Sequence, residues 1–322
     1  MCTQTIDRSV YVPDVPVGRK TCDENGGGRS LHLLSSDRLR LDVSTVSTGE
    51  MYSWVGQRRF DDRDLLDMVE YGSITTGEFA AFLSEIFQGD DARFTYNGET
   101  VLDGRTLAEF GFRVSYENSH YPFGNGQHRV ITGYDGTFLI DPATTDLVQL
   151  VVRTNQLPSE TGACYASTTL NYARVRLRGD NVLLPRESLL YVFTIEGTTT
   201  TNRTAFSDCH EFLGESTLTF DSRSSAVDSV GRNSVPQTSL FPPGLPFRVA
   251  LTVGIDTATA AAGDSLKAWL VTPIGMARRY WSRPVLVSRA VSFASLSPMV
   301  PSLQLCSNSS SIPWTLAVLR RA

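Results

Sequence analysis

Lysine is nearly absent from this chain of 322 residues: Lys20 and Lys267 are the only two, so almost all positive charge is arginine. The net charge is −5 and the sequence pI is about 5.5. A nucleic-acid partner usually requires a basic surface, so none is expected. A run of about 18 apolar residues, the length that crosses a bilayer as a helix, is also missing. We therefore expect no transmembrane segment.

The five cysteines follow none of the spacings that hold zinc or form a redox pair, because no C-x-x-C occurs. Two interpretations of these cysteines remain open. Cys2 and Cys22 could close a short loop in an oxidising compartment, or the thiols are unpaired. The four histidines are far apart in the sequence and lack metal-ligand spacing. No metal site and no cofactor are expected.

The sequence contains no constellation typical of an enzyme. Its densest reactive cluster is Asp208-Cys209-His210-Glu211. A catalytic Cys–His pair must be in contact, whereas adjacent residues on a strand point to opposite faces. We therefore predict a non-enzymatic protein. The first residues are polar and have no apolar signal-peptide core, so the chain is expected to be cytosolic or to lack the N-terminus of its precursor.

Most of the chain has the patterns of β-strands. Residues 38–46 alternate polar and apolar, with Leu39, Leu41 and Val43 on one face, and residues 50–55 supply a second strand after a turn. Asp103-Gly104 predicts another hairpin. Residues 133–220 predict an antiparallel meander, in which Phe138 and Ile140 share a face. This order of elements predicts an antiparallel sheet backed by a helix.

The one convincing helix is predicted from Thr75 to about Gln88. Thr75 and Glu78 have capping-box spacing, in which hydroxyl and carboxylate satisfy unpaired N–H groups of the first turn. An apolar stripe follows at helical spacing: Phe79, Phe82, Leu83, Ile86 and Phe87. A shorter helix is predicted at 62–70.

Five regions are predicted along the chain. They are a loose lead-in with at most one strand, Thr3–Val12 (1–30), a half-barrel sheet (31–221), a linker (222–240), a partial β domain (241–274) and an irregular, disordered or out-of-frame tail (275–322). The tail is set apart because no Asp or Glu follows Asp264, while arginines accumulate.

Several segments carry a resemblance to known proteins: YSWVG at 52–56, GTFLIDPAT at 136–144, YARVR at 172–176, LLP at 183–185, NRTAFS at 202–207 and GES at 214–216. Through them the chain resembles a family of uncharacterised bacterial cell-envelope proteins common in acidobacteria-like genomes. More remotely, it is similar to the lipoprotein-carrier fold of LolA, also seen in the sensor RseB. This resemblance implies a curved antiparallel half-barrel with one or two helices on its concave side, in the periplasm or cell envelope.

The resemblance also implies a function without chemistry, in which an apolar concavity holds a lipid, an acyl chain or a lipidated peptide. The predicted lining residues are Trp54, Phe79, Phe82, Phe138, Ile140, Tyr191 and Phe193. The same residues could simply pack the helix against the sheet. The alternative function is a structural or protein-interaction module of the envelope with no small-molecule ligand.

Overall fold

A computed structural model describes residues 1–211 apart from short gaps (16–21, 23–29, 47–48, 58–59, 62–64, 70–72, 89–91, 125–129 and 155–156), residues 249–270 apart from 257, 265 and 267, and residues 286–287. The chain divides into two units. Met1–Glu211 and Asp256–Ser265 belong to the first. In the second, β13 (Val249–Leu251), β14 (Ala268–Leu270) and β15 (Leu286–Val287) form a three-stranded antiparallel sheet. The linker predicted at 222–240 and nearly all of the predicted tail lie outside the described residues.

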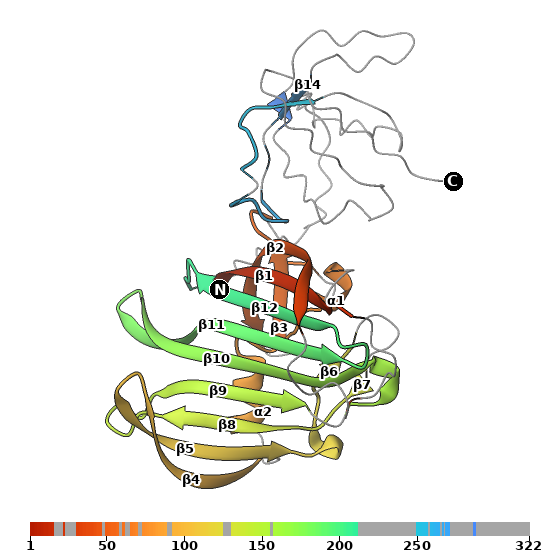
Figure 1. Ribbon diagram of the computed structural model, residues 1–322. Helices are drawn as coiled ribbons and strands as arrows, with labels where there is room; N and C mark the ends of the chain where they lie inside the picture. Colours follow the sequence, from red (N-terminus) through yellow and green to blue (C-terminus); the bar gives the residue numbers. More distant parts are fainter. Residues whose placement is uncertain are drawn as a thin grey trace, which may run out of the picture. The chain divides into compact units, whose positions relative to one another are not determined.

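The first unit is built on a ten-stranded antiparallel sheet (Figure 1). Its strands, in spatial order, are β3 (Gly49–Trp54), β2 (Leu31–Val46), β1 (Cys2–Pro13), β12 (Thr199–Ser207), β11 (Asp180–Thr194), β10 (Ala163–Leu177), β9 (Leu147–Thr154), β8 (Tyr134–Ile140), β5 (Arg105–Val114) and β4 (Arg93–Leu102). Since the order runs from β3 to β4 without returning, the sheet is open. A short hairpin, β6 (Pro122–Phe123) with β7 (Val130–Ile131), is separate.

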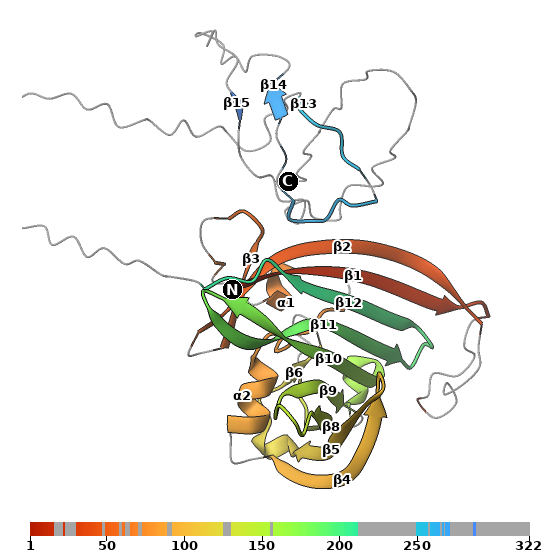
Figure 2. The ribbon, with the colours of Figure 1, turned by 90° about the vertical axis from the view of Figure 1, so that its left-hand side faces the viewer.

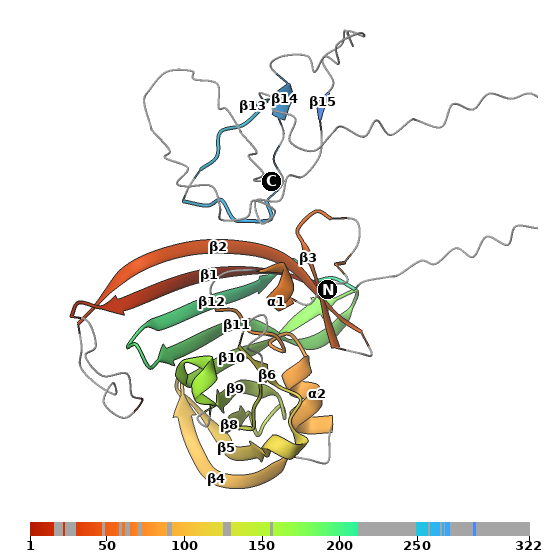
Figure 3. The ribbon, with the colours of Figure 1, turned by 90° about the vertical axis from the view of Figure 1, so that its right-hand side faces the viewer.

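The sheet curves, and its concave side carries α1 (Leu65–Met68) and α2 (Ala81–Gln88) (Figures 2 and 3). The short 3₁₀ helices η1 (Tyr116–Asn118) and η3 (Ser159–Thr161) lie in connections. The predicted fold class, a mainly β half-barrel with helices on its concave side, is confirmed. The meander predicted at 133–220 corresponds to the run β8 to β12 as far as Ser207, and residues 212–220 lie outside the described residues.

The strand allowed for at Thr3–Val12 in the predicted lead-in is present as β1, and it has a more central place than a lead-in implies. β1 is an inner strand, paired with β2 on one side and with β12 on the other. Cys2, Gln4, Ile6 and Arg8 alternate with less buried residues, so one face of β1 points into the protein. The pairing with β12 explains why sequence reasoning undervalued β1, since its partner lies almost 200 residues away in the sequence.

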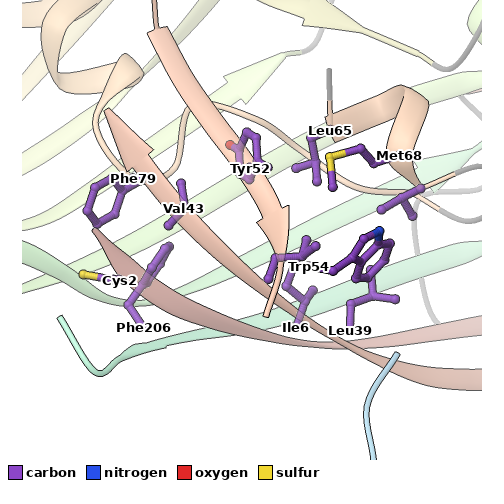
Figure 4. Close-up of a cluster of buried hydrophobic side chains, with 12 residues drawn as sticks. Cys2, Ile6, Leu39, Val43, Tyr52, Trp54, Leu65, Met68, Phe79 and Phe206 are labelled. Carbon is purple, nitrogen blue, oxygen red and sulfur yellow. The ribbon is translucent and has the colours of Figure 1, made fainter. Parts of the chain in front are cut away.

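Two large clusters of buried apolar side chains lie on the concave side, and a smaller third cluster contains Ala163, Ala166, Leu190 and Val192. The N-terminal cluster contains Cys2, Ile6, Leu39, Leu41, Val43, Tyr52, Trp54, Leu65, Met68, Val69, Phe79 and Phe206 (Figure 4). The aromatic cluster contains Phe82, Ile86, Phe112, Val114, Tyr121, Tyr134, Phe138, Leu147, Leu150, Val152, Leu170 and Tyr172. The predicted hairpin at 38–55 and its inward face therefore belong to the first cluster.

Two disulfides join distant parts of the first unit. Cys2 pairs with Cys209, and Cys22 pairs with Cys164, across sequence separations of 207 and 142 residues. The short loop considered between Cys2 and Cys22 is wrong, and so is the interpretation of these thiols as unpaired. A sequence motif could not have indicated either pair, because the partners are far apart in the sequence; the pairing of β1 with β12 brings Cys2 close to Cys209.

Residues 256–264 also return to this sheet. Ala262 forms a parallel bridge with Leu39 in β2, and its backbone exchanges hydrogen bonds with the backbones of Arg38 and Arg40 at 2.8 Å each. The Arg40 guanidinium forms an ion pair with Asp264. The segment therefore extends the sheet beside β2 beyond the end of β3, where Trp54 pairs with Leu41.

Candidate functional site

Five of the seven predicted lining residues lie on the concave side, but in two places. Trp54 and Phe79 are buried in the N-terminal cluster. Phe82 and Phe138 are buried in the aromatic cluster, and Ile140 packs against it. The structure therefore brings Phe82, Phe138 and Ile140 together and separates them from the other two.

Tyr191 and Phe193 lie on the opposite face of the sheet. Leu190 is buried on the concave side, and Ser188, which shares its face of β11, reaches the segment before α2. Side chains alternate along a strand, so Tyr191 and Phe193 point the other way. Tyr191 is 37% exposed and contacts Tyr165 there. These two residues do not line the concave side with the other five.

Aromatic rings continue from the aromatic cluster to the surface at the open edge of the sheet. We call this group the aromatic edge: Phe87, Phe94, Tyr96, Phe110 and Phe138. Phe87 of α2 stacks on Phe94 of β4 with ring centroids 5.9 Å apart, and Phe138 lies 5.0 Å from Phe87 and 5.1 Å from Phe110. Tyr96 lies 5.3 Å from Phe110.

The outer rings of the aromatic edge are open to solvent. Phe87, Phe94 and Tyr96 are 40%, 48% and 58% exposed, whereas Phe138 is 7% exposed. Phe138 contacts Phe112, and Phe112 contacts the buried Tyr134, so the ring contacts continue into the aromatic cluster. A contiguous group of exposed aromatic side chains that adjoins a buried cluster is a candidate binding surface.

Sequence reasoning missed the outer part of this surface. The predicted hairpin at Asp103-Gly104 could have revealed it. In that hairpin Phe94 pairs with Phe112 and Tyr96 pairs with Phe110, so the four rings lie across two neighbouring strands. That hairpin is confirmed, with both turn residues at positive φ.

The start of α2 is capped by a residue from another part of the chain. Backbone N–H groups of Gly77, Ala80 and Ala81 donate to the carboxylate of Glu50 in β3, at 2.9, 2.7 and 3.0 Å. The capping box predicted at Thr75 and Glu78 is wrong. α2 therefore begins at Ala81, later than predicted.

Glu78 instead points to the sheet. Its Oε2 accepts a hydrogen bond of 2.7 Å from Ser188 Oγ in β11, and Thr204 of β12 forms another hydrogen bond with its carboxyl. Burial raises the pKa of Glu78 to about 7; the Ser188 bond opposes this rise and the negative field of Glu50 adds to it. A carboxyl in this position is close to half protonated near neutral pH.

Further polar contacts hold the same segment on the sheet. Asn202 Nδ2 donates to the backbone oxygen of Ser73 at 2.7 Å, and Thr75 Oγ1 lies 3.1 Å from the hydroxyl of Tyr121. Burial raises the pKa of that Tyr121 hydroxyl to about 12. The polar contacts of residues 73–81 thus lie between the two apolar clusters.

The cluster at 208–211 has no free thiol, because Cys209 is in a disulfide. His210 Nδ1 lies 2.9 Å from the backbone oxygen of Asp208. Within the part of the chain that the structure describes, no group of three or more His, Cys, Asp or Glu side chains could hold a metal ion. The helices among these same residues include none with the length and hydropathy to cross a membrane.

Comparisons with known proteins show only a remote likeness. No protein-family model matches the chain, and the search of curated proteins found no match. A solved domain described as outer membrane lipoprotein-sorting, from Vibrio parahaemolyticus, aligns with 12% identity and a TM-score of 0.28 over 64% of this chain and 83% of that one. A DUF1329 family protein from Desulfovibrio piger aligns with 13% identity and a TM-score of 0.26 over 66% and 87%. Likeness at this level says nothing about what this chain binds, and the resemblance to the cell-envelope family stays a prediction.

Proposed function

We propose that this protein is a non-enzymatic, extracytoplasmic binding protein that takes an apolar chain, such as the acyl chain of a lipid or of a lipidated peptide, at the aromatic edge. The observation that carries the proposal is the unbroken series of ring contacts from the exposed Phe94 and Tyr96 to the buried Phe138. Of the seven predicted lining residues, Phe138 belongs to the aromatic edge, while Phe82 lies in the adjoining aromatic cluster and Ile140 packs against that cluster.

The chemistry of the aromatic edge suits an acyl chain. Rings offer a wide apolar surface without directional hydrogen bonds, and each methylene removed from water contributes about 0.8 kcal/mol. Phe87 belongs to α2, a helix of only eight residues, whereas Phe94 and Tyr96 belong to the edge strand β4. A chain could therefore lie between helix and strand after small side-chain movements.

The two disulfides support the proposed extracytoplasmic location. Disulfides persist in oxidising compartments and are rare in the cytosol. Cys2–Cys209 and Cys22–Cys164 therefore support an extracytoplasmic site, such as the periplasm or the cell envelope.

Lipid uptake by purified protein tests the proposal. The protein is stripped of lipid with solvent, incubated with palmitate or with a diacylated lipopeptide, and examined by native mass spectrometry. We expect wild type to gain the mass of the probe, and the double variant Phe94→Ser/Tyr96→Ser to lose most of that gain. Tyr116→Ser is the matched control, because Tyr116 is also an exposed tyrosine, 64% exposed in η1, but lies outside the aromatic edge.

The second candidate is a protein-interaction module that uses the same exposed rings. The position of β4 at the edge of the sheet favours it, since edge strands pair with other chains. The irregularity in β4 between Tyr96 and Gly98 weakens backbone pairing there, so side chains rather than an added strand would make the contact. No mass gain with either probe would contradict lipid binding and leave this candidate.

A further inference from the structure

We infer that Glu78 is a pH-sensitive latch: its protonated carboxyl holds residues 73–81 on the concave side of the sheet, and its ionisation loosens them. The inference does not depend on lipid binding at the aromatic edge. It rests on the place of one buried carboxyl between the segment before α2 and the middle of the sheet.

The latch joins two elements that are not neighbours in the sequence. Glu78 is 6% exposed, and its partner Ser188, 110 residues later, is 3% exposed. Ser188 of β11 and Thr204 of β12 are paired across the two strands. Their hydroxyl groups therefore both form hydrogen bonds with the Glu78 carboxyl, from adjacent strands. A buried carboxyl in such a site keeps its hydrogen bonds only while the segment stays in place.

The surroundings oppose a negative charge on Glu78. The titratable groups that face it are Glu50 and Tyr52 from β3, Tyr172 from β10 and Tyr121 from the connection before β6. Each of them is neutral or negative at pH 7 to 8. The hydroxyl of Tyr172 has no hydrogen-bond partner among the described residues, and burial raises its pKa with the fields of Glu50 and Glu78 adding. Ionised Glu78 would therefore be a buried anion that faces a second carboxylate.

Opening of the segment relieves this cost, because Glu78 then meets water. The pKa of the closed form is about 7, against 4.5 for a free glutamate. Because loss of the proton is linked to opening of residues 73–81, the segment opens more easily as the pH rises. Between pH 6 and pH 8 the population of the open form should grow about tenfold. The same opening separates Phe79 and α2 from the sheet, since both adjoin Glu78 in the chain.

Hydrogen exchange of residues 73–88 tests the latch in the full chain. After correction for intrinsic rates, wild-type amides in this segment should exchange about tenfold faster at pH 8 than at pH 6. The variant Glu78→Gln keeps the shape and hydrogen bonds but cannot ionise, so its corrected rates should not change. Glu85→Gln is the matched control: Glu85 lies on α2, and its carboxylate accepts a bond from the backbone of His120. This control should respond to pH as wild type does.

Two results would overturn the latch. One is equal corrected exchange at both pH values in wild type, and the other is the same pH response in Glu78→Gln as in wild type. If Glu78→Gln does not fold, the carboxyl ¹³C resonance of Glu78 in labelled wild-type protein decides. A midpoint near 7 supports the latch, whereas a midpoint near 4.5 contradicts it.

Discussion

The two large clusters on the concave side are stabilised by different kinds of contact. The N-terminal cluster is tied by distant parts of the chain: the disulfide Cys2–Cys209, and Ala262, which packs against it and bonds to β2. The aromatic cluster is built mostly from successive hairpins, and it reaches solvent through Phe87 and Phe94. The N-terminal half of the concave side is thus a sealed core, whereas the other half leaves aromatic side chains exposed at its edge.

The largest effect is expected from loss of the ring at the centre of the aromatic cluster. Phe82 is 2% exposed and packs against Tyr121 and Tyr134, with centroids 5.2 and 6.2 Å away. Phe82→Ala should lower the free energy of unfolding by about 4 kcal/mol, because it removes buried area and leaves a cavity. Urea denaturation measures this. Phe87→Ala on the same helix should cost only about 1 kcal/mol, since its ring is 40% exposed; equal losses would contradict the contrast between inner and outer rings.

Loss of the disulfide Cys2–Cys209 in the sealed half should lower the free energy of unfolding slightly less than loss of the Phe82 ring. Cys2→Ser/Cys209→Ser releases a constraint between residues separated by 207 positions. The free energy of unfolding should fall by about 3 kcal/mol, as for other native disulfides. Thermal denaturation checks the loss, and proteolysis should cut first near β1. If stability is unchanged and proteolysis does not cut near β1, the pairing of β1 with its neighbouring strands is enough to hold the N-terminal cluster together.

Glu78 lies between the halves, and its effect depends on pH. Its raised pKa means that the folded protein binds the proton more tightly than the unfolded chain does. The resulting stabilisation is complete below pH 4.5 and is lost as the pH rises through about 7. The stability of wild type relative to Glu78→Gln should therefore fall by about 3 kcal/mol from pH 4.5 to pH 8. Denaturation at several pH values measures the difference, and a constant difference would contradict the raised pKa.

Local patterns in the sequence predicted the strands well. Alternation of Leu39, Leu41 and Val43 fixed the inward face of β2, and Asp103-Gly104 located the turn between β4 and β5. These features depend on neighbours in the chain. The fold class followed because most strands pair with the next strand along the sequence.

Features that depend on distant residues were not predictable. The cap of α2 comes from Glu50, about 30 residues before the helix, so the capping box formed by Thr75 and Glu78 was a misleading local signal. The disulfide partners and the inner place of β1 arise in the same way. For the site, Tyr191 and Phe193 lie two residues apart on a strand and so share a face, but the burial of Leu190 and the contact of Ser188 are needed to show which face is concave.

The smallest effect on stability, with the largest effect on binding, is expected at the outer rim of the aromatic edge. Phe94 is 48% exposed, so Phe94→Ala should lower the free energy of unfolding by less than about 1 kcal/mol. If the ring contacts the ligand, the dissociation constant for palmitate should rise about fivefold, because loss of about 1 kcal/mol of contact has that effect. Phe79→Ala in the sealed half should show the reverse: it should cost several kcal/mol of stability, because Phe79 is buried against Phe206, and leave palmitate affinity unchanged under conditions where it stays folded. Isothermal titration calorimetry paired with urea denaturation separates the two outcomes, and weaker binding by both variants in equal measure would show that the two halves form one site.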